Sequence, residues 1–400
     1  MKYIFCSFMF DDIEENIRNS KSPNSVSGHK FQLFMLKGLA ENGCDITVVN
    51  VPRVRRYPDY KKLAIHEKDF KVDGVTYGRS IGFINVYGLN YLTQINNAYK
   101  MIDGIIKKNP SEDIVLLVYN TYLSPIIALR RIKSKYPRVK ICNLIGDIYG
   151  QYGLKSAKSL HGKLIDRVHE KMDMMAKECD AFGLATNNMA FALGVAEKPY
   201  VVIEGMYEAN ELLCSHSNNS TKRKSVFYAG ALHKEYGIEH LLRAFALIDD
   251  SNMEFYIAGD GDAVGEIKAF SEKDKRLHYL GFITPSEVDK YQSAATALVN
   301  PRTSDYEYVK YSFASKNLEY LASGTPYIAH NLPCNPKEYS EYIIYPSNES
   351  DESLARTITE VCNLPEEKRV AIGKRNMEFI RKEKNPKVQM RKIDSMLKTL

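Results

Sequence analysis

The sequence predicts an α/β fold of two doubly wound domains, each a parallel sheet with helices on both faces. Short apolar runs alternate with amphipathic stretches of helical period, and this alternation stops at the polar segment 215–224 and then restarts. A chain of 400 residues is also long enough for two or three domains with a buried core each. We expect the two domains to face each other across a cleft, with ligands at the carboxyl ends of the strands.

The first half of the chain supplies the first domain. Its first apolar run, 3–10, is followed at once by Asp11 and Asp12, so it is predicted as a strand and not as a secretion signal. The first helix is expected to stop at Asn42 and Gly43. The predicted strands are 3–10, 45–51, 113–119, 139–145, 181–185 and 200–203, and the predicted helices are 31–41, 91–107, 123–135 and 156–177.

The second half repeats the alternation after the polar segment. Its predicted strands are 225–229, 254–258, 277–279, 297–300 and 327–329, and its predicted helices are 238–248, 262–273, 285–293 and 315–323. We therefore expect a first domain over 1–205, a linker over 206–224 and a second domain over 225–380. The last helices lie within 365–400, and the helix at about 380–400 is expected to return to the first domain.

Composition excludes several classes of protein. The chain is 44% hydrophobic and 26% charged, which is typical of folded globular chains and not of disordered or collagenous ones. No segment reaches the roughly 18 to 20 continuous apolar residues of a membrane span, so we expect a cytoplasmic protein. The seven cysteines are scattered and form no Cys-x-x-Cys pair, which favours reduced thiols over a zinc or redox site.

Charge is distributed unevenly along the chain. Residues 1–200 carry 29 Lys and Arg against 20 Asp and Glu, a net +9, whereas residues 201–400 carry 26 against 29, a net −3. A basic half indicates an anionic partner. Its cations gather in 53–62, 130–140 and 155–177, which are either solvated faces or a surface for anionic lipid. Few aromatic residues lie among them, so a nucleic-acid partner is not expected.

The segment 299–328 carries the densest chemical signal. A strand ends at Asn300, a polar loop follows, and a helix opens at Ser315 with Lys316 in its first turn. Free N–H groups of that turn, together with Lys316, would suit a diphosphate. Glu319, one turn later, could accept hydrogen bonds from ribose hydroxyls. A capped amphipathic helix with a Lys–Glu surface pair is the alternative.

The chain resembles the retaining glycosyltransferases of family 4 (group 1) over nearly its full length. The motifs that carry the resemblance are YAGALHKEYGIEHLLRAF (228–245), FYIAGDGD (255–262), LHYLGFITPSEV (277–288), LVNPR (298–302) and FASKNLEYLASGTPYI (313–328). Their order and approximate spacing are those of the family. The resemblance implies the GT-B fold, with a nucleotide-sugar donor in the second domain and an acceptor in the first.

The resemblance also assigns residues to roles. Glu319 matches the second Glu of the Glu-x7-Glu motif, which holds the donor ribose. The other positions expected to bind the donor are Phe313, Ala314, Ser315 and Lys316 under the sugar and diphosphate, Gly281 and Phe282 at the base, Gly230 in the first glycine turn, and Gly28 in the first-domain loop that reaches the donor phosphates. A simple turn glycine before a helix is the alternative for Gly28.

Several positions depart from the family pattern. Tyr311 stands where the first Glu of the motif is expected, unless the loop is shifted and Glu307 takes its place. Ala231 and Tyr236 stand where an Arg and a Lys are usual. Lys234, or its neighbour His233, could supply the missing cation, and an ordinary surface lysine is an equal alternative.

The first domain departs from the pattern as well. Asn120 lies where the family has a histidine after the fourth strand, and Asp147 follows the next strand. Asp147 could contact the acceptor, or act as a base for its hydroxyl, or cap a helix. The candidate catalytic residues are Lys316, Glu319, Asp147 and Asn120.

No metal and no cofactor besides the nucleotide-sugar are expected. Asp260 and Asp262 resemble an Asp-x-Asp metal motif, but they lie in a glycine turn that matches the family. The glycines there lack the dinucleotide spacing, so a nicotinamide site is not expected. Side-chain cations and helix N–H groups can neutralise a leaving diphosphate without a metal.

The sequence thus predicts transfer of a hexose or N-acetylhexosamine, from a nucleotide-sugar that is expected to be a UDP-sugar, to a hydroxyl of an envelope or exopolysaccharide precursor. The protein would be cytoplasmic, with peripheral association at the inner face of the membrane. Two alternatives stay open. Ala231, Tyr236 and Tyr311 could mark a non-catalytic partner subunit, and a sugar-nucleotide epimerase of the same fold would need further acid and base groups around the sugar.

Overall fold

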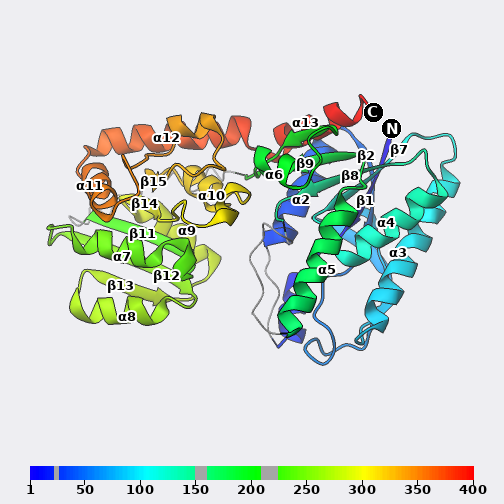
Figure 1. Ribbon diagram of the computed structural model, residues 1–400, viewed down its shortest axis with the longest axis horizontal. Helices are drawn as coiled ribbons and strands as arrows, with labels where there is room; N and C mark the ends of the chain where they lie inside the picture. Colours follow the sequence, from blue (N-terminus) through cyan, green and yellow to red (C-terminus); the bar gives the residue numbers. More distant parts are fainter. Residues whose placement is uncertain (22–26, 149–159, 209–223) are drawn as a thin grey trace. The chain divides into compact units, whose positions relative to one another are not determined.

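The computed structural model describes residues 1–21, 27–148, 160–208 and 224–400, which fold into two compact units. Unit 1 comprises Met1–Met206 and Pro386–Leu400, and unit 2 comprises Tyr207–Asn385 (Figure 1). Most of the linker predicted over 206–224 lies outside the described residues.

Unit 1 is built on an eight-stranded sheet with the order β10-β9-β8-β7-β1-β2-β5-β4. All neighbours pair in parallel except β4, which runs antiparallel to β5 at the edge. The strands are β1 (Lys2–Ser7), β2 (Asp45–Asn50), β4 (Lys68–Val72), β5 (Val75–Ser80), β7 (Ile114–Tyr119), β8 (Lys140–Ile145), β9 (Ala181–Leu184) and β10 (Tyr200–Val202). The central strands are buried on both faces, which explains their continuous apolar sequence.

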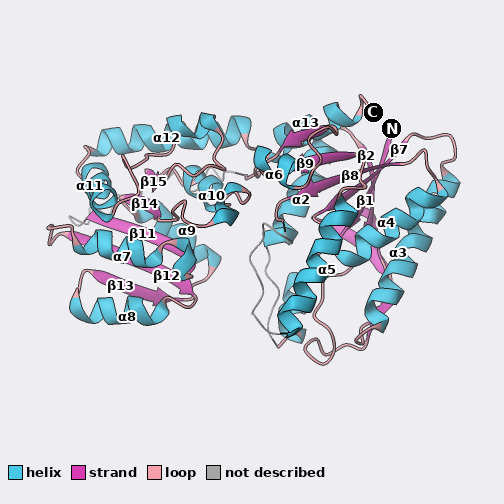
Figure 2. Ribbon diagram, in the orientation of Figure 1, coloured by secondary structure: helices cyan, strands magenta, loops and turns pink. Residues whose placement is uncertain are grey.

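Helices cover both faces of this sheet (Figure 2). One face packs Tyr3 and Phe5 against Met35 and Leu36 of α2 and Ile393 of α13. Other buried residues of the strands meet α3 and α4 on the opposite face. The helices of unit 1 are α1 (Ile13–Asn19), α2 (Ser27–Glu41), α3 (Leu89–Lys108), α4 (Leu123–Lys135), α5 (Leu160–Ala176), α6 (Asn187–Ala192) and α13 (Pro386–Leu397).

The C-terminal helix α13 belongs to unit 1, as the sequence predicts. The Tyr3 hydroxyl donates to the Asp394 carboxylate at 2.7 Å in a buried position. The Asn42 side chain donates to the backbone carbonyl of Lys387 at 2.8 Å. The return begins at Pro386 and not near 380, because the end of the preceding helix stays in unit 2, where the Tyr207 N–H donates to the Lys384 carbonyl.

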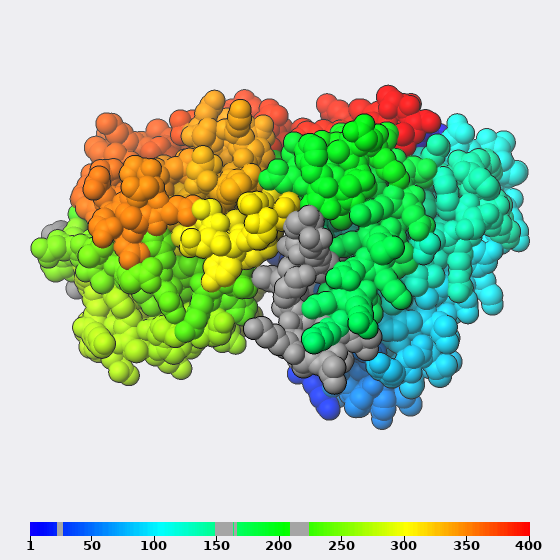
Figure 3. Space-filling view, in the orientation of Figure 1, coloured from blue at the N-terminus to red at the C-terminus, as the bar shows by residue number. Residues whose placement is uncertain are grey.

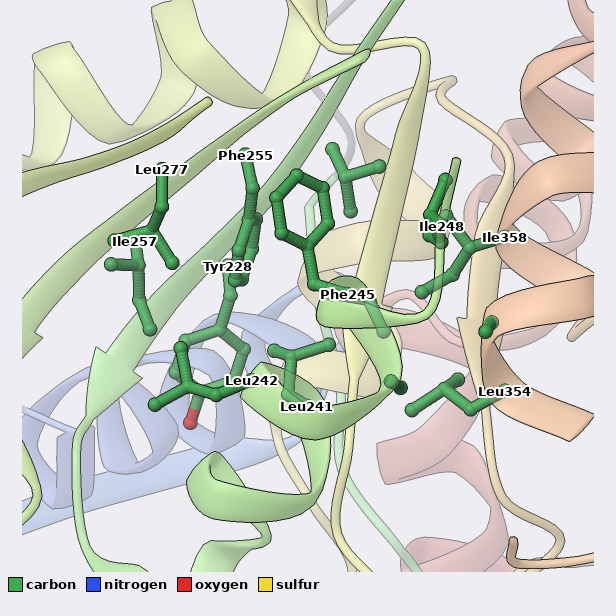
Figure 4. Packing of buried hydrophobic residues seen from close by; sticks show 14 of the residues in the cluster. Tyr228, Leu241, Leu242, Phe245, Ile248, Phe255, Ile257, Leu277, Leu354 and Ile358 are labelled. Atoms are coloured by element: carbon green, nitrogen blue, oxygen red, sulfur yellow. The ribbon is translucent and has the colours of Figure 1, made fainter. Parts of the chain in front are cut away.

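Unit 2 carries a parallel sheet with the order β13-β12-β11-β14-β15, and this doubly wound arrangement confirms the predicted fold class. Figure 4 shows Tyr228 packed with Leu241 and Leu242 of α7 on one face. Phe227 and Leu318 belong to the cluster on the other face. The elements are β11 (Lys224–Ala231), α7 (Ile238–Ala246), β12 (Met253–Asp260), α8 (Val264–Lys273), β13 (Leu277–Gly281), α9 (Pro285–Ala294), β14 (Ala297–Asn300), α10 (Lys316–Ala322), β15 (Tyr327–Ala329), α11 (Asp351–Cys362) and α12 (Glu366–Glu383).

Several elements were not expected from the sequence. Besides β4 and β5 they include α1, α6, α11 and a two-stranded sheet of β3 (Ala64–Ile65) and β6 (Phe83–Ile84). The predicted strand 3–10 ends at Ser7, and there the Asn50 side chain accepts from the Ser7 hydroxyl and from the Met9 N–H. In the described part of the chain no helix combines the length and apolarity needed to cross a bilayer. The described cysteines are free thiols, and Cys214 lies outside the described residues.

Candidate functional site

Helix α10 is fixed at the carboxyl edge of the unit 2 sheet by two buried tyrosines. The Tyr320 hydroxyl accepts from the Ala229 N–H at 3.0 Å and donates to the Ala229 carbonyl at 3.3 Å. The Tyr327 hydroxyl donates to the Asn317 side chain at 2.6 Å. Because both hydrogen bonds are buried, they hold α10 in place against β11 and β15. The backbone positions from which the Lys316 and Glu319 side chains extend are therefore fixed.

Lys316 reaches the first glycine turn. A Cβ added at Gly230 would lie 2.0 Å from the Lys316 Nζ, and Gly230 has a φ of 155°. The ammonium is 5.4 Å from the centroid of the Tyr228 ring. A side chain at position 230 would therefore occupy the place of the ammonium, and the structure brings together two residues that the sequence assigned to donor binding.

The charges around Lys316 favour an anion. Loss of hydration lowers the pKa of Lys316 from its usual value, Glu319 raises it, and the Arg302 guanidinium lowers it further. Arg302, for which the sequence alone indicates no role, lies over the rings of Tyr236 and Tyr308. A desolvated cation that has a second cation beside it gains from a bound anion.

The residues before α10 are engaged in the fold. Phe313 packs against Tyr339 with 5.3 Å between ring centroids, and Ala314 is buried beside it. The N–H groups of Asn317, Leu318 and Glu319 donate to the carbonyls of Ala314 and Ser315. The expected set of free N–H groups is therefore reduced by this tight turn, and side-chain cations must supply more of the positive charge.

Lys234 lies in the loop after β11 and is paired with acidic side chains. Its ammonium contacts Glu239 at 3.3 Å and forms a short hydrogen bond with Glu266. The Asp262 carboxylate accepts from the Lys234 N–H at 3.0 Å, so it anchors this loop. His233 is 3.4 Å from the same carboxylate. This part of the Asp-x-Asp sequence thus has a structural role.

The remaining donor positions of unit 2 lie on other strands and loops. Gly281 ends β13, which β12 separates from β11, and the Phe282 side chain beside it is 86% exposed. The yellow segment after β14 lies at the surface of unit 2 (Figure 3). In it the Tyr311 hydroxyl donates to Glu307 at 3.4 Å, and Lys310 pairs with Glu307 at 2.9 Å. Tyr311 and Glu307 therefore form one side-chain pair.

Gly28 lies at the first turn of α2 in unit 1. A Cβ there would be 3.2 Å from both the Arg53 Nη1 and the Tyr122 hydroxyl. The Arg53 guanidinium is 5.8 to 6.0 Å from the rings of Phe8, Phe10 and Tyr122. In the sequence Arg53 is one of several basic residues, and only the packing shows that it approaches Gly28.

Asn120 joins the ends of two strands. It has a φ of 53°, is 1% exposed, and its side-chain oxygen accepts from the N–H groups of Gly146 at 2.7 Å and Asp147 at 3.4 Å. Asn120 thus positions Asp147, which follows β8; desolvation raises the pKa of the Asp147 carboxyl, and its hydrogen bond with the Asn120 side chain opposes that rise. A buried amide with these partners is suited to positioning more than to contact with a substrate.

Comparisons with known proteins agree with this architecture. Residues 214–379 match the model of the family described as glycosyl transferases group 1. Alpha-monoglucosyldiacylglycerol synthase of Streptococcus pneumoniae is 29% identical over 142 residues, which are 34% of this chain and 30% of that protein. The matched region thus spans less than a third of that relative.

Solved structures resemble the whole chain. Sucrose-phosphate synthase from Thermosynechococcus elongatus has a TM-score of 0.68 at 13% identity and covers 100% of this chain and 99% of its own. HepE from Anabaena, in complex with UDP, has a TM-score of 0.61 at 14% identity and covers 100% of both chains. An E. coli trehalose-6-phosphate protein bound with UDP-2-fluoro glucose has a TM-score of 0.63 at 10% identity. The match covers 100% of this chain and 99% of the E. coli chain. The chain has the GT-B fold, and the part of its sequence that matches the glycosyl transferases group 1 family, residues 214–379, lies within unit 2.

Proposed function

We propose that the chain is a retaining glycosyltransferase of family 4 that transfers a hexose or N-acetylhexosamine from a nucleotide-sugar, with UDP as the expected nucleotide. The observation that carries this proposal is the Lys316 ammonium beside Gly230, at the carboxyl edge of a group 1 transferase domain. Two structural neighbours were solved with UDP or UDP-2-fluoro glucose bound, which supports a UDP donor here. The acceptor would be a hydroxyl of an envelope or exopolysaccharide precursor.

Each donor contact has a physical task in this proposal. Lys316 neutralises the leaving diphosphate, and Glu319 accepts hydrogen bonds from the ribose hydroxyls. The backbone at Gly281 and Phe282 would recognise the base, and the exposed Phe282 ring offers a face for it. We infer that the reaction needs no metal, because side-chain cations supply the charge that a metal would otherwise provide.

The reaction would proceed by attack on the same face of the sugar. The bond between the anomeric carbon and the diphosphate oxygen breaks while a bond to the acceptor oxygen forms on that face. The acceptor proton passes to the departing phosphate oxygen, so the chain acts by positioning and charge stabilisation. Asp147 of unit 1 is the alternative base, because desolvation raises the pKa of its carboxyl and so favours uptake of a proton.

Nucleotide release from a panel of donors tests the function. We expect release from at least one of UDP-glucose, UDP-galactose and UDP-N-acetylglucosamine, and less from GDP-mannose. Glu319→Ala should lower turnover at least about tenfold, because a charge-assisted hydrogen bond to ribose is lost. UDP should also bind wild type more tightly than 2′,3′-dideoxy-UDP, and Glu319→Ala should remove that preference. An unchanged preference would contradict the role of Glu319.

Two further measurements separate the alternatives: calorimetry with UDP and GDP, and incubation of free UDP-sugars without acceptor. If wild type binds neither UDP nor GDP in calorimetry, the chain is a non-catalytic partner subunit, as Ala231, Tyr236 and Tyr311 could indicate. If free UDP-sugars are interconverted without acceptor, it is an epimerase. Release of nucleotide that depends on an acceptor saccharide supports the transferase.

We also infer that unit 1 docks on the anionic inner face of the cytoplasmic membrane. The candidate surface, which we call the Tyr87 patch, comprises Arg55, Arg56, Tyr57, Leu63, Ile84 and Tyr87. Asn85 joins its segments, because the Asn85 side chain donates to the Arg55 carbonyl and the Asn85 backbone forms hydrogen bonds with the backbones of Tyr57 and Leu63. The Tyr87 side chain is 79% exposed, and Arg56 lies 4.9 Å from its ring centroid. Exposed aromatic and basic side chains together suit an anionic lipid surface.

Vesicle sedimentation tests the membrane proposal with the full chain. Binding to phosphatidylcholine vesicles that contain phosphatidylglycerol should exceed binding to phosphatidylcholine alone and should weaken in high salt, because counterions screen exposed charges. Arg56→Ser and Tyr87→Ser should each weaken it about fivefold, roughly 1 kcal/mol per side chain. Lys71→Ser removes an exposed cation outside the patch and is the control. Equal binding by all variants would contradict the assignment of this surface.

A further inference from the structure

The glycine turn after β11 lacks the cations that the family pattern places there. Ala231 and Tyr236 occupy the usual Arg and Lys positions. The cation that remains in this loop, Lys234, is already paired with Glu239 and Glu266. A diphosphate at Gly230 would therefore meet Lys316 as its first cation, and a second one must come from another element.

Arg302 is placed to be that second cation. It follows β14, which pairs directly with β11. The loop after β11 packs against the backbone of the residue before Arg302, since a Cβ added at Gly237 would lie 2.2 Å from the Pro301 carbonyl oxygen. Two segments that are distant in the sequence thus meet at this edge of the sheet.

Aromatic rings hold the guanidinium in place. The Arg302 Cζ is 4.5 Å from the centroid of the Tyr236 ring and 5.4 Å from that of Tyr308. The Tyr308 hydroxyl donates to the Glu235 carbonyl at 3.4 Å, which ties the second ring to the same loop. Tyr236, which replaces the usual Lys, therefore orients a cation that belongs to a different strand.

One nitrogen of the guanidinium is left without a partner. Among the described residues, the buried Arg302 Nε has no hydrogen-bond partner. The charge of Arg302 also acts on the neighbouring groups, because it lowers the pKa of Lys316 and opposes the rise in the pKa of Tyr228. Two cations that repel each other would both gain from a shared polyanion.

We propose that Arg302 is the second cation of a diphosphate site at Gly230, and that Tyr236 is the positioning residue that holds it there. This inference rests on the proposed function, because it names a further contact of the same donor. The departures at Ala231 and Tyr236 then indicate a relocated cation and not a lost site.

Equilibrium binding to wild type, Arg302→Gln and Arg302→Lys tests the proposal, with UDP, inorganic pyrophosphate and uridine as probes in calorimetry. Arg302→Gln should weaken UDP and pyrophosphate about ten- to a hundredfold, as expected for a lost hydrogen bond to a charged group, and leave uridine unchanged. Arg302→Lys should bind UDP and pyrophosphate with affinities between those of wild type and Arg302→Gln, because lysine keeps the charge but lacks the planar guanidinium. Arg375→Gln, which removes another arginine that lies over a tyrosine ring in unit 2, is the matched control. Thermal unfolding checks that each variant is folded.

The outcomes separate this inference from the proposed function. If UDP binds wild type and Arg302→Gln equally, the second cation is wrong while the donor proposal stands. An equal loss for all three probes would make Arg302 structural and overturn the inference. If pyrophosphate binds wild type but UDP does not, the UDP donor is wrong, and the effect of Arg302→Gln on pyrophosphate still decides the cation. If neither binds, both proposals fail.

Discussion

Lys316→Ala is expected to lower kcat/KM for nucleotide release by about 10²- to 10³-fold, the effect typical of removing a group that stabilises developing negative charge. The ammonium lies beside Gly230, 2.0 Å from the position that a Cβ added there would take. Tyr320 and Tyr327 hold that helix through buried hydrogen bonds, so the loss is not repaired by a shift of the backbone. Steady-state kinetics with the donor found in the screen measures the effect.

The dependence on pH gives a second check on Lys316. Because the pKa of Lys316 lies below its usual value of 10.5, kcat/KM should fall as pH rises toward that value and the ammonium loses its proton. Lys316→Arg should abolish this alkaline decline, since a guanidinium stays charged. Lys290→Ala, an exposed lysine of α9, should behave as wild type. Wild-type rates in Lys316→Ala would show that the site lies elsewhere.

Gly38→Ala is expected to lower the free energy of unfolding of unit 1 by about 1–3 kcal/mol, the usual effect of overpacking. The added methyl would lie 2.3 Å from the backbone carbonyl oxygen of Pro386 and 2.7 Å from Met390. A backbone group cannot turn aside as a flexible side chain can, so α13 must move away from α2. Urea unfolding gives the change, and hydrogen exchange over 386–397 should show faster opening.

A second glycine provides the matched control for Gly38. Gly104 lies in α3 of the same unit, and an added Cβ there meets nothing within 4 Å. Gly104→Ala should therefore raise the stability by about 0.5–1 kcal/mol through helix propensity alone. If both variants changed stability in the same direction and by the same amount, the close contact between α2 and α13 would be contradicted.

The regular core of the fold could be predicted because its strands are buried on both faces. Strands such as 140–145 and 297–300 appear as unbroken apolar runs, and the structure places them within a residue of the prediction. Strands β4 and β5 were missed because their exposed residues break that pattern. A local signal did exist: Asp73 and Gly74 between them both have a positive φ, which is typical of an Asp-Gly hairpin turn.

The placement of the candidate residues was predictable where it depends on one segment. Lys316 and Glu319 share a helix that the sequence places at a strand end, and the structure brings Lys316 to Gly230, while their binding of a donor stays a prediction. Arg302 gave no such signal, because its importance depends on the strand order that sets β14 beside β11. In the sequence Arg302 is only a basic residue two positions after an apolar strand, and the pairing of that strand with β11 is what brings it to the glycine turn.

The place of α13 has a consequence for how the protein is made. A ribosome completes 1–206 long before 386–400, and all of unit 2 is synthesised in between. Until then the apolar surface that Met390, Ile393 and Leu397 later cover in unit 1 stays open. Unit 2 can therefore complete its core during translation, whereas unit 1 finishes last although it begins first. Any fragment that stops before Pro386 exposes that surface. Packing of α13 onto unit 1 is therefore the event that completes the native state of the nascent chain.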